Sequence, residues 1–251
     1  MNFFEKILFY ISVPKCTYCG ETLDIDDKAL CKECLRNYFD LKARNCSICG
    51  KPLYKCDCTS KYLEAHFVHK LIKVFRYKPG ENSPANELIY KLKRENRKDI
   101  IDFLSDELKN SIETSVEIKE NTIITSVPRR KKAKIKYGID HSEKLAKAVA
   151  KKLSIEYIPT LKSLAKKPQK KSENIDKRIE NAKFKLKNNN LNLAHKTVIL
   201  IDDIVTTGAS MGAAAFNLKT LGPKRIIGAT LSVAYKDNYI PPSKEDRFRP
   251  K

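Results

Sequence analysis

The stretch that decides the fold is Val198–Ser210, with the sequence VILIDDIVTTGAS. Four apolar, β-favouring residues in a row predict a strand that is buried on both faces, as in a parallel sheet. Two acids, Asp202 and Asp203, follow at the end of that strand, and the small-residue loop Thr206–Ser210 comes next. Apolar residues then recur at helical spacing through Met211–Leu221. The stretch therefore predicts a strand, a loop and a helix in succession.

This unit has the chemistry of a phosphate site. Backbone amides of the loop and of the helix start carry partial positive charge and point to one place. Gly208 allows the backbone to approach closely, and hydroxyl donors come from Thr206, Thr207 and Ser210. The two acids would repel a phosphate, so they fit neighbouring sugar hydroxyls or a divalent cation. An ordinary strand with a capped helix would leave the run of small residues after the acids unexplained.

The size and composition of the chain indicate a folded, water-soluble protein. Its 251 residues fit one large domain, or a mid-sized domain with a small one. A hydrophobic fraction of 41% supports a core and excludes wholesale disorder. No apolar run is long enough to cross a bilayer. Residues 3–13 are apolar but carry Glu5 and Lys6, which disfavours a signal peptide and predicts a packed helix. We expect a cytoplasmic protein.

The positive charge is concentrated in one region. The net charge is +20, and residues 129–178 hold 17 Lys and Arg against 5 Asp and Glu, which is 12 of the 20. A general enrichment in lysine would spread the charge more evenly. The concentration favours a surface that faces an anion, either a phosphorylated metabolite or nucleic acid.

All eight cysteines lie near the start of the chain, in three C-x2-C pairs and one C-x-C pair. Two such pairs close a tetrahedral thiolate site for zinc. Pairing in chain order gives one site from Cys16, Cys19, Cys31 and Cys34 and another from Cys46, Cys49, Cys56 and Cys58. Chain order is the simplest reading, and the spacing does not exclude an interleaved pairing. A disulfide framework would require an oxidising compartment, so we expect two closed, structural zinc sites.

A second strand followed by basic residues lies in the middle of the chain. Thr122–Val127 reads as a buried strand, and the basic loop Arg129–Lys136 follows it. In a parallel sheet, this loop lies at the same edge as the phosphate loop. A helix is predicted over Lys144–Leu153. The Lys-rich span Leu164–Lys187 has no clear strand pattern, and long loops of this kind often act as lids.

The predicted architecture is an α/β domain with a mainly parallel sheet and helices on both faces, preceded by a double zinc-ribbon-like module. The module takes residues 1–60, the α/β domain residues 61–235 and a frayed tail residues 236–251. We expect the module to pack near the carboxyl edge of the sheet. The predicted strands lie near 66–77, 122–127, 155–159, 198–202 and 226–233.

Residues 198–210 resemble the 5-phosphoribosyl 1-diphosphate (PRPP) motif of type I phosphoribosyltransferases. The resemblance implies that Asp202 and Asp203 bind the ribose hydroxyls and are the catalytic acids. It assigns the 5-phosphate to Thr206, Thr207, Gly208, Ala209 and Ser210. It assigns the diphosphate to Arg129 and Arg130, with Lys131 and Lys132 as further candidates, together with Mg2+. Lid lysines that could complete the diphosphate site are Lys166, Lys167, Lys170 and Lys171.

The wider chain is similar to the competence-associated ComF family and its GntX-like relatives. The resemblance rests on the cysteine module, Phe75-Arg76-Tyr77, the helix Ala85–Lys93 and the strand end at Val127-Pro128. The segment YGIDH at 137–141 stands where that family has Arg-Gly-Phe-Asn-Gln, so four of its five residues differ. A second family block appears as Gln169, Ser172, Arg178, Asn181 and Phe184. The resemblance implies a role in DNA uptake.

Three functions stay open at this point. The first is Mg-dependent transfer of a phosphoribosyl group to an unknown acceptor with release of diphosphate. The second is PRPP binding without catalysis. The third is a zinc protein that binds single-stranded DNA and works with the DNA-uptake machinery. The intact acid pair and glycine favour a working PRPP site, whereas the acceptor and the oligomeric state are not legible.

Overall fold

The structure is a computed structural model that describes residues 14–131, 135, 138, 140–165 and 182–234. Several predictions fall outside these residues. They are the helix at 3–13, Lys132, the lid lysines Lys166, Lys167, Lys170 and Lys171, the block residues Gln169, Ser172, Arg178 and Asn181, and the tail at 236–251.

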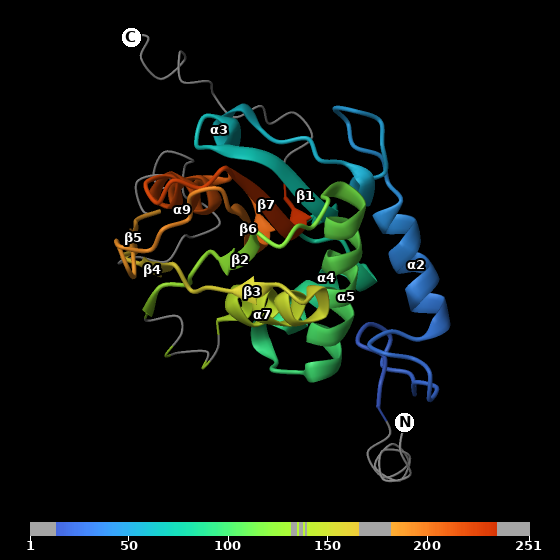
Figure 1. Cartoon of the computed structure of the whole chain (residues 1–251). Coiled ribbons are helices and arrows are strands. Elements are labelled where there is room, and N and C mark those ends of the chain that lie inside the picture. Colours follow the sequence, from blue (N-terminus) through green and yellow to red (C-terminus); the bar gives the residue numbers. More distant parts are fainter. Residues whose placement is uncertain (1–13, 132–134, 136–137, 139, 166–181, 235–251) are drawn as a thin grey trace, which may run out of the picture.

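Five parallel strands form the central sheet in the order β1-β7-β6-β2-β3 (Figure 1). They are β1 (Val68–Arg76), β2 (Thr122–Ser126), β3 (Glu156–Tyr157), β6 (Thr197–Val205) and β7 (Arg225–Val233). All five coincide with predicted strands. The central strand β6 is almost wholly buried because it is paired on both sides and covered on both faces.

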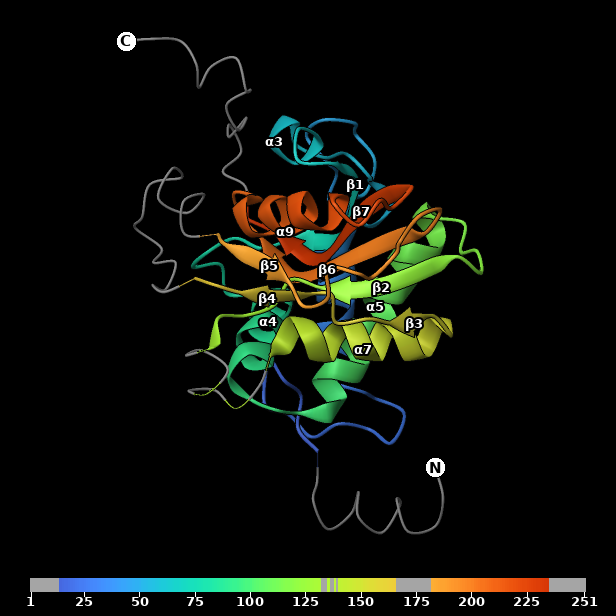
Figure 2. The same ribbon diagram turned by 60° about the vertical axis from the view of Figure 1, so that its left-hand side comes forward.

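Helices cover both faces of the sheet (Figure 2). One face carries α4 (Pro84–Arg94), α5 (Lys98–Ser115) and α7 (His141–Leu153), whose apolar residues share one core cluster. The other face carries α3 (Lys61–Glu64) and α9 (Ala209–Lys219), which build a second cluster. Helix α5 was not predicted, although Ile100, Leu104, Leu108 and Ile112 recur at the helical four-residue spacing and are fully buried.

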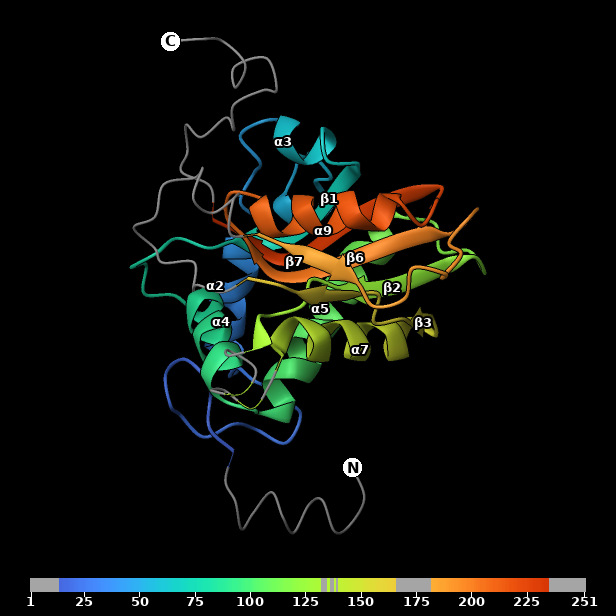
Figure 3. The same ribbon diagram turned by 90° about the vertical axis from the view of Figure 1, so that its left-hand side faces the viewer.

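The connections place a switch point between β2 and β6. Strands β2 and β6 are neighbours, and α7 follows β2 on one face whereas α9 follows β6 on the other (Figure 3). The chain therefore leaves the two adjacent carboxyl ends in opposite directions. In open α/β sheets, ligands bind in the crevice that this divergence creates.

A small antiparallel pair corrects the prediction that the span 164–187 lacks strands. β4 (Leu161–Ser163) pairs with β5 (Phe184–Leu186). Phe184 and Leu186 pack against the second core cluster, and Lys185 between them is exposed. Three residues are too few for this alternation to stand out from the lysines around it.

The cysteine-rich segment contains α2 (Lys32–Lys42) and the short 3-10 turn η1 (Leu53–Lys55). Leu23, Leu30 and Tyr38 lie in the same core cluster as residues of α4 and α5. The segment also touches the loop after β1, where Arg44 pairs with Glu81 and the Tyr18 hydroxyl donates to the carbonyl of Asn82. It thus reaches the carboxyl edge of the sheet from the outside, and α4 lies between it and the acids of β6. Among the described residues, no helix is long and apolar enough to span a membrane.

Candidate active site and cysteine clusters

The two acids of the motif lie inside β6 and not after its end. β6 continues to Val205 because Ile204 and Val205 keep their parallel pairing with β7. The Asp202 and Asp203 residues are only 9% and 8% exposed. The strand therefore holds both carboxylates rigidly at the switch point.

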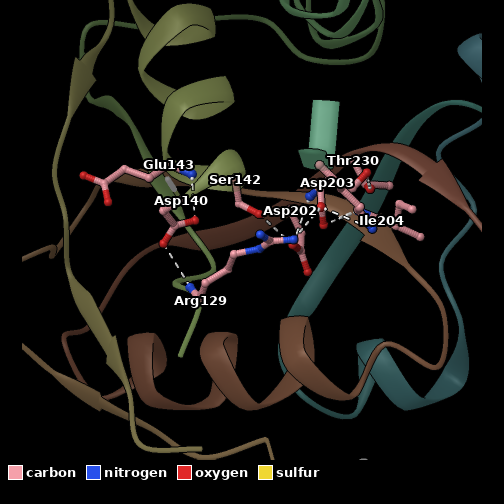
Figure 4. Close-up of polar contacts among 9 residues, drawn as sticks. Arg129, Asp140, Ser142, Glu143, Asp202, Asp203, Ile204 and Thr230 are labelled. Atoms are coloured by element: carbon pink, nitrogen blue, oxygen red, sulfur yellow. Dashed lines mark hydrogen bonds and ion pairs between the residues drawn. The ribbon is translucent and has the colours of Figure 1, made fainter. Parts of the chain in front are cut away.

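Asp202 is bound by neutral donors. Its Oδ1 accepts a hydrogen bond from the Ser142 hydroxyl at 3.1 Å and another from the amide of Asp203 at 2.9 Å (Figure 4). Burial and the neighbouring Asp203 charge raise the pKa of Asp202 well above its ordinary value of 3.8, although the bond from Ser142 opposes them. The site therefore disfavours a negative charge on Asp202.

Asp203 faces two cations. Its Oδ1 accepts from the amide of Ile204 at 2.8 Å, and its Oδ2 lies 3.4 Å from Lys93 Nζ and 3.9 Å from an Arg129 guanidinium nitrogen. Burial raises the pKa of Asp203, but Lys93 and Arg129 outweigh it and lower that pKa to about 2. Oδ2 is buried and has no hydrogen bond from the described residues. It is an acceptor held ready for a ligand.

A carboxylate joins the basic loop to the start of α7. Asp140 caps this helix by accepting from the amide of Glu143 at 3.3 Å, and it accepts from the amide of Arg129 at 3.0 Å (Figure 4). Arg129 is thereby fixed beside Asp203. His141, the first residue of α7, is 2% exposed, and its Nδ1 has no described partner. Burial and then the charge of Arg129 lower the pKa of His141 to about 4, so its imidazole is neutral at neutral pH.

The predicted phosphate loop is a tight turn at residues 206–208, and α9 begins at Ala209, two residues earlier than predicted. Gly208 adopts φ +78°, which favours glycine. The Thr207 hydroxyl accepts from the amide of Ala209 at 3.3 Å. Thr206, Thr207 and Ser210 are partly exposed, whereas Gly208 and Ala209 are buried. The turn therefore offers hydroxyls and the start of an 11-residue helix to a ligand.

Helix α3 packs directly on this turn. A Cβ at Gly208 would lie 3.1 Å from the Leu63 side chain, and a Cβ at Gly212 would lie 2.7 Å from the Tyr62 ring. The first turn of α9 therefore carries glycine at 212 because the Tyr62 ring occupies the space of a side chain there.

The structure brings together Asp202, Asp203 and Arg129 as predicted. It adds Lys93, Ser142 and His141, which the sequence analysis did not assign to the site. Ser142 and His141 lie at the start of a helix that follows a strand end, and that position was a usable signal. Lys93 was within a predicted helix. Its approach to Asp203 depends on how α4 packs against β6 in the tertiary structure, which the spacing of residues in the sequence does not reveal.

The eight cysteines gather in chain order. The four sulfurs of Cys16, Cys19, Cys31 and Cys34 lie within 4.8 Å of one another, and so do those of Cys46, Cys49, Cys56 and Cys58. Tetrahedral zinc with bonds of about 2.3 Å requires sulfurs about 3.8 Å apart. Measured pairs fit this value: Cys19–Cys31 is 3.7 Å and Cys49–Cys56 is 3.5 Å. The donor sets and spacing therefore fit zinc, and the interleaved pairing is excluded.

One thiol in each cluster is poised to ionise. Burial raises the pKa of Cys16 and of Cys46, but bonds from nearby backbone amides outweigh it and lower each pKa to about 7. In the second cluster, burial raises the pKa of Cys56 to about 12 although Lys73 opposes the rise. A bound cation is the ordinary way in which such a set of thiols becomes fully deprotonated.

Residues 140–249 match the family model of the phosphoribosyl transferase domain. This range starts at the cap of α7 and includes β6, the turn, α9 and β7. With the parallel sheet, it supports the type I phosphoribosyltransferase fold, so the predicted fold class is confirmed. No curated protein sequence matches the chain.

Solved structures of low similarity include two adenine phosphoribosyltransferases. One, from Saccharomyces cerevisiae, was crystallised with adenine and an imino-altritol bisphosphate. It is 18% identical over 54% of this chain and 67% of its own, with a TM-score of 0.33. The other is 19% identical over 61% of this chain and 75% of its own, with a TM-score of 0.32.

Proposed function

We propose that the protein binds PRPP with Mg2+ and transfers its phosphoribosyl group to an acceptor with release of diphosphate. The observation that carries this proposal is the acid pair of β6, set beside the turn at 206–208 and the start of α9 on one side and Arg129 and Lys93 on the other. A ribose with a 5-phosphate and a 1-diphosphate needs three environments side by side: one for the phosphate, one for the sugar hydroxyls and one for the diphosphate. The family match at residues 140–249 supports the same reading.

Each described residue has a role in this proposal. The turn at 206–208 and the start of α9 hold the 5-phosphate. Asp202 and Asp203 bind the ribose hydroxyls, and the negative charge of Asp203 stabilises the positive ring that develops as the bond to diphosphate breaks. Arg129, and Arg130 beside it, hold the diphosphate. Lys93 leaves Asp203 when the ligand arrives and becomes a second cation for the leaving group.

The site also fits Mg2+. Asp203 Oδ2, which accepts no hydrogen bond from the described residues, is a hard donor of the kind that this ion prefers, and the ligand's own oxygens would supply the remaining positions. Bound there, the ion would neutralise the leaving diphosphate. We propose in addition that each cysteine cluster holds a structural zinc ion, since four thiolates leave no open position for catalysis.

We further propose that the protein is of the ComF type, acts in the cytoplasm and serves DNA uptake. The support is the joining of a cysteine module to the PRPP motif in one chain. PRPP binding without turnover, and binding of single-stranded DNA, are the alternatives that the experiment below separates.

The test is calorimetry of PRPP with Mg2+ on the zinc-loaded protein, beside the variant Asp202→Ala/Asp203→Ala. The matched control, Glu117→Ala/Glu120→Ala, removes two exposed acids at the opposite edge of the sheet. Binding in the wild type and in the control, lost in the acid-pair variant, is the expected result. Absence of PRPP binding in the wild type would refute the proposal.

A second assay asks whether the bound PRPP is consumed. Release of diphosphate with one member of a panel of bases and amines would establish transfer. Silence across the panel with intact binding would leave a PRPP-binding protein without catalysis.

A further inference from the structure

A lysine is buried in the sheet beside the second cysteine cluster. Lys73 lies in the edge strand β1 and is only 3% exposed. Its Nζ donates to the carbonyl of Cys58 at 2.6 Å and to the carbonyl of Leu71 at 3.2 Å. No carboxylate of the described residues forms an ion pair with it. The ammonium is therefore satisfied by hydrogen bonds but not balanced in charge.

Such a group is costly without a nearby negative charge. Moving an ammonium from water into a protein interior costs several kcal/mol unless an opposite charge compensates it. The carbonyl that accepts the shortest bond from Lys73 belongs to Cys58, which is one of the four clustered thiols. Zinc held by four thiolates carries a net charge of minus two, and Cys58, whose carbonyl accepts from the ammonium, would be one of those thiolates.

The backbone around these thiols is fixed by the same strand. The amide of Leu71 donates to the carbonyl of Asp57 at 3.3 Å, and Lys70 pairs with the Asp57 carboxylate at 2.8 Å. Residues 56–58 thus run along the free edge of β1. Lys70 is half-exposed and has its own acid, so it differs from Lys73 in both burial and charge balance.

The first cluster has no equivalent group among the described residues. The cation that approaches it, Arg97, donates to the carbonyl of Lys15 but is paired with Asp99 through two nitrogens. The charge of Arg97 is therefore already matched. The two clusters differ in this respect although their thiols are alike.

We propose that Lys73 is the counter-charge of the second zinc site and links metal binding there to the stability of the sheet edge. This inference rests on the proposal that the cluster holds zinc. Its consequence is that the contribution of Lys73 to stability is favourable when zinc is bound and unfavourable when zinc is absent. With zinc bound, the lysine stabilises the site, whereas the reduced, zinc-free chain lacks the charge of minus two that compensates the buried ammonium.

The experiment compares the full-length, zinc-loaded wild type with Lys73→Met, Lys73→Arg and the control Lys70→Met. Zinc is withdrawn by a chelator in increasing concentration, and mass spectrometry of alkylated peptides reports which cysteines are released. In Lys73→Met we expect the zinc affinity of the second cluster to be about 10- to 100-fold lower, so that this cluster loses zinc at a lower chelator concentration. This is the usual effect of losing an outer partner of a metal site. We expect Cys16–Cys34 to be unchanged, Lys73→Arg to keep most of the affinity, and Lys70→Met to resemble the wild type.

The outcomes separate the two proposals. Equal release from the second cluster in Lys73→Met and the wild type would overturn the role of Lys73. Failure of the wild type to retain zinc would overturn the zinc proposal itself, and it would be seen before any variant is made. If Lys73→Met does not fold with zinc, Lys73→Arg decides: recovered folding and affinity support the role, and lost affinity overturns it.

A thermal melt of the reduced, zinc-free proteins tests whether Lys73 destabilises the protein when zinc is absent. We expect zinc-free Lys73→Met to unfold at a higher temperature than the zinc-free wild type. If the Lys73 side chain served only packing, Lys73→Met would lower the melting temperature both with and without zinc. That result would count against the inference.

Discussion

At the scale of single residues, two adjacent aspartates have opposite electrostatic surroundings. Asp202 has a raised pKa, so its ionised form costs stability, and the cost grows as pH rises above the ordinary value of 3.8. Asp203 has a pKa lowered to about 2 by Lys93 and Arg129 against its burial. Its ionised form therefore adds stability above pH 3.8, and that stability is lost only as pH falls toward 2.

Asp202→Asn should therefore stabilise the ligand-free protein at neutral pH, because a neutral amide removes the cost of a buried carboxylate beside Asp203. Asp203→Asn should destabilise it, because two cations lose their acid. Urea unfolding of zinc-loaded protein checks both variants above about pH 6, where thiolates keep their metal. The gain from Asp202→Asn should shrink as pH is lowered. Equal effects of the two variants would contradict the asymmetry.

At the scale of elements, the cysteine module is attached to the α/β core by a buried polar triad. Glu107 of α5 accepts from the Tyr38 hydroxyl at 2.9 Å and from Lys42 Nζ at 2.7 Å, both from α2. Burial, and then the charge of Glu107, raise the pKa of Tyr38. The Tyr38 ring also contacts Phe75 and Phe103 edge-on. One helix of the module thus joins a strand and a helix of the core.

Glu107→Ala should cost about 3–5 kcal/mol, because it leaves the Lys42 ammonium buried without an acid. The control Glu113→Ala on the same helix removes a surface pair with Lys109 and should cost about 0.5 kcal/mol or less. Urea unfolding of the two zinc-loaded variants gives the comparison. Similar losses in both would mean that the triad does not hold the module in place.

Elements were predictable from sequence where a periodic signal spans many residues. Val198–Ile201 is apolar without interruption and became the centre of β6, and Thr122–Val127 consists mostly of β-branched residues and became β2. The extension of β6 to Val205 was not visible, because its pairing with β7 outweighs the two acids that seem to end the strand. The contact of Lys93 with Asp203 depends on where α4 packs, and the charge balance of Lys73 depends on a neighbour 15 residues away.

At the scale of the whole molecule, the sheet and the cysteine module share one core. Residues 56–58 cover the free edge of β1, and Leu23, Leu30 and Tyr38 fill the same cluster as Phe75 and Leu104. Edge strands left open are prone to pair with other chains. The module therefore covers an edge of the sheet in addition to carrying the two cysteine clusters.

A chain that begins at Lys61 should aggregate or stay unfolded, because it exposes this edge and the apolar surface of α5. Light scattering after gel filtration, beside the full chain, is the measurement. A monomeric, soluble product that binds PRPP would show that the α/β part folds without its cover.

The contact between Tyr62 and Gly212 has a consequence for evolution. With 2.7 Å between the ring and the position of a new Cβ, Gly212 cannot gain a side chain alone unless the Tyr62 ring, α3 or α9 moves. The order of substitutions at the two positions is then constrained. Descendants that acquire alanine at 212 should carry a smaller side chain at 62, and the intermediate with only the first change should be the rare one.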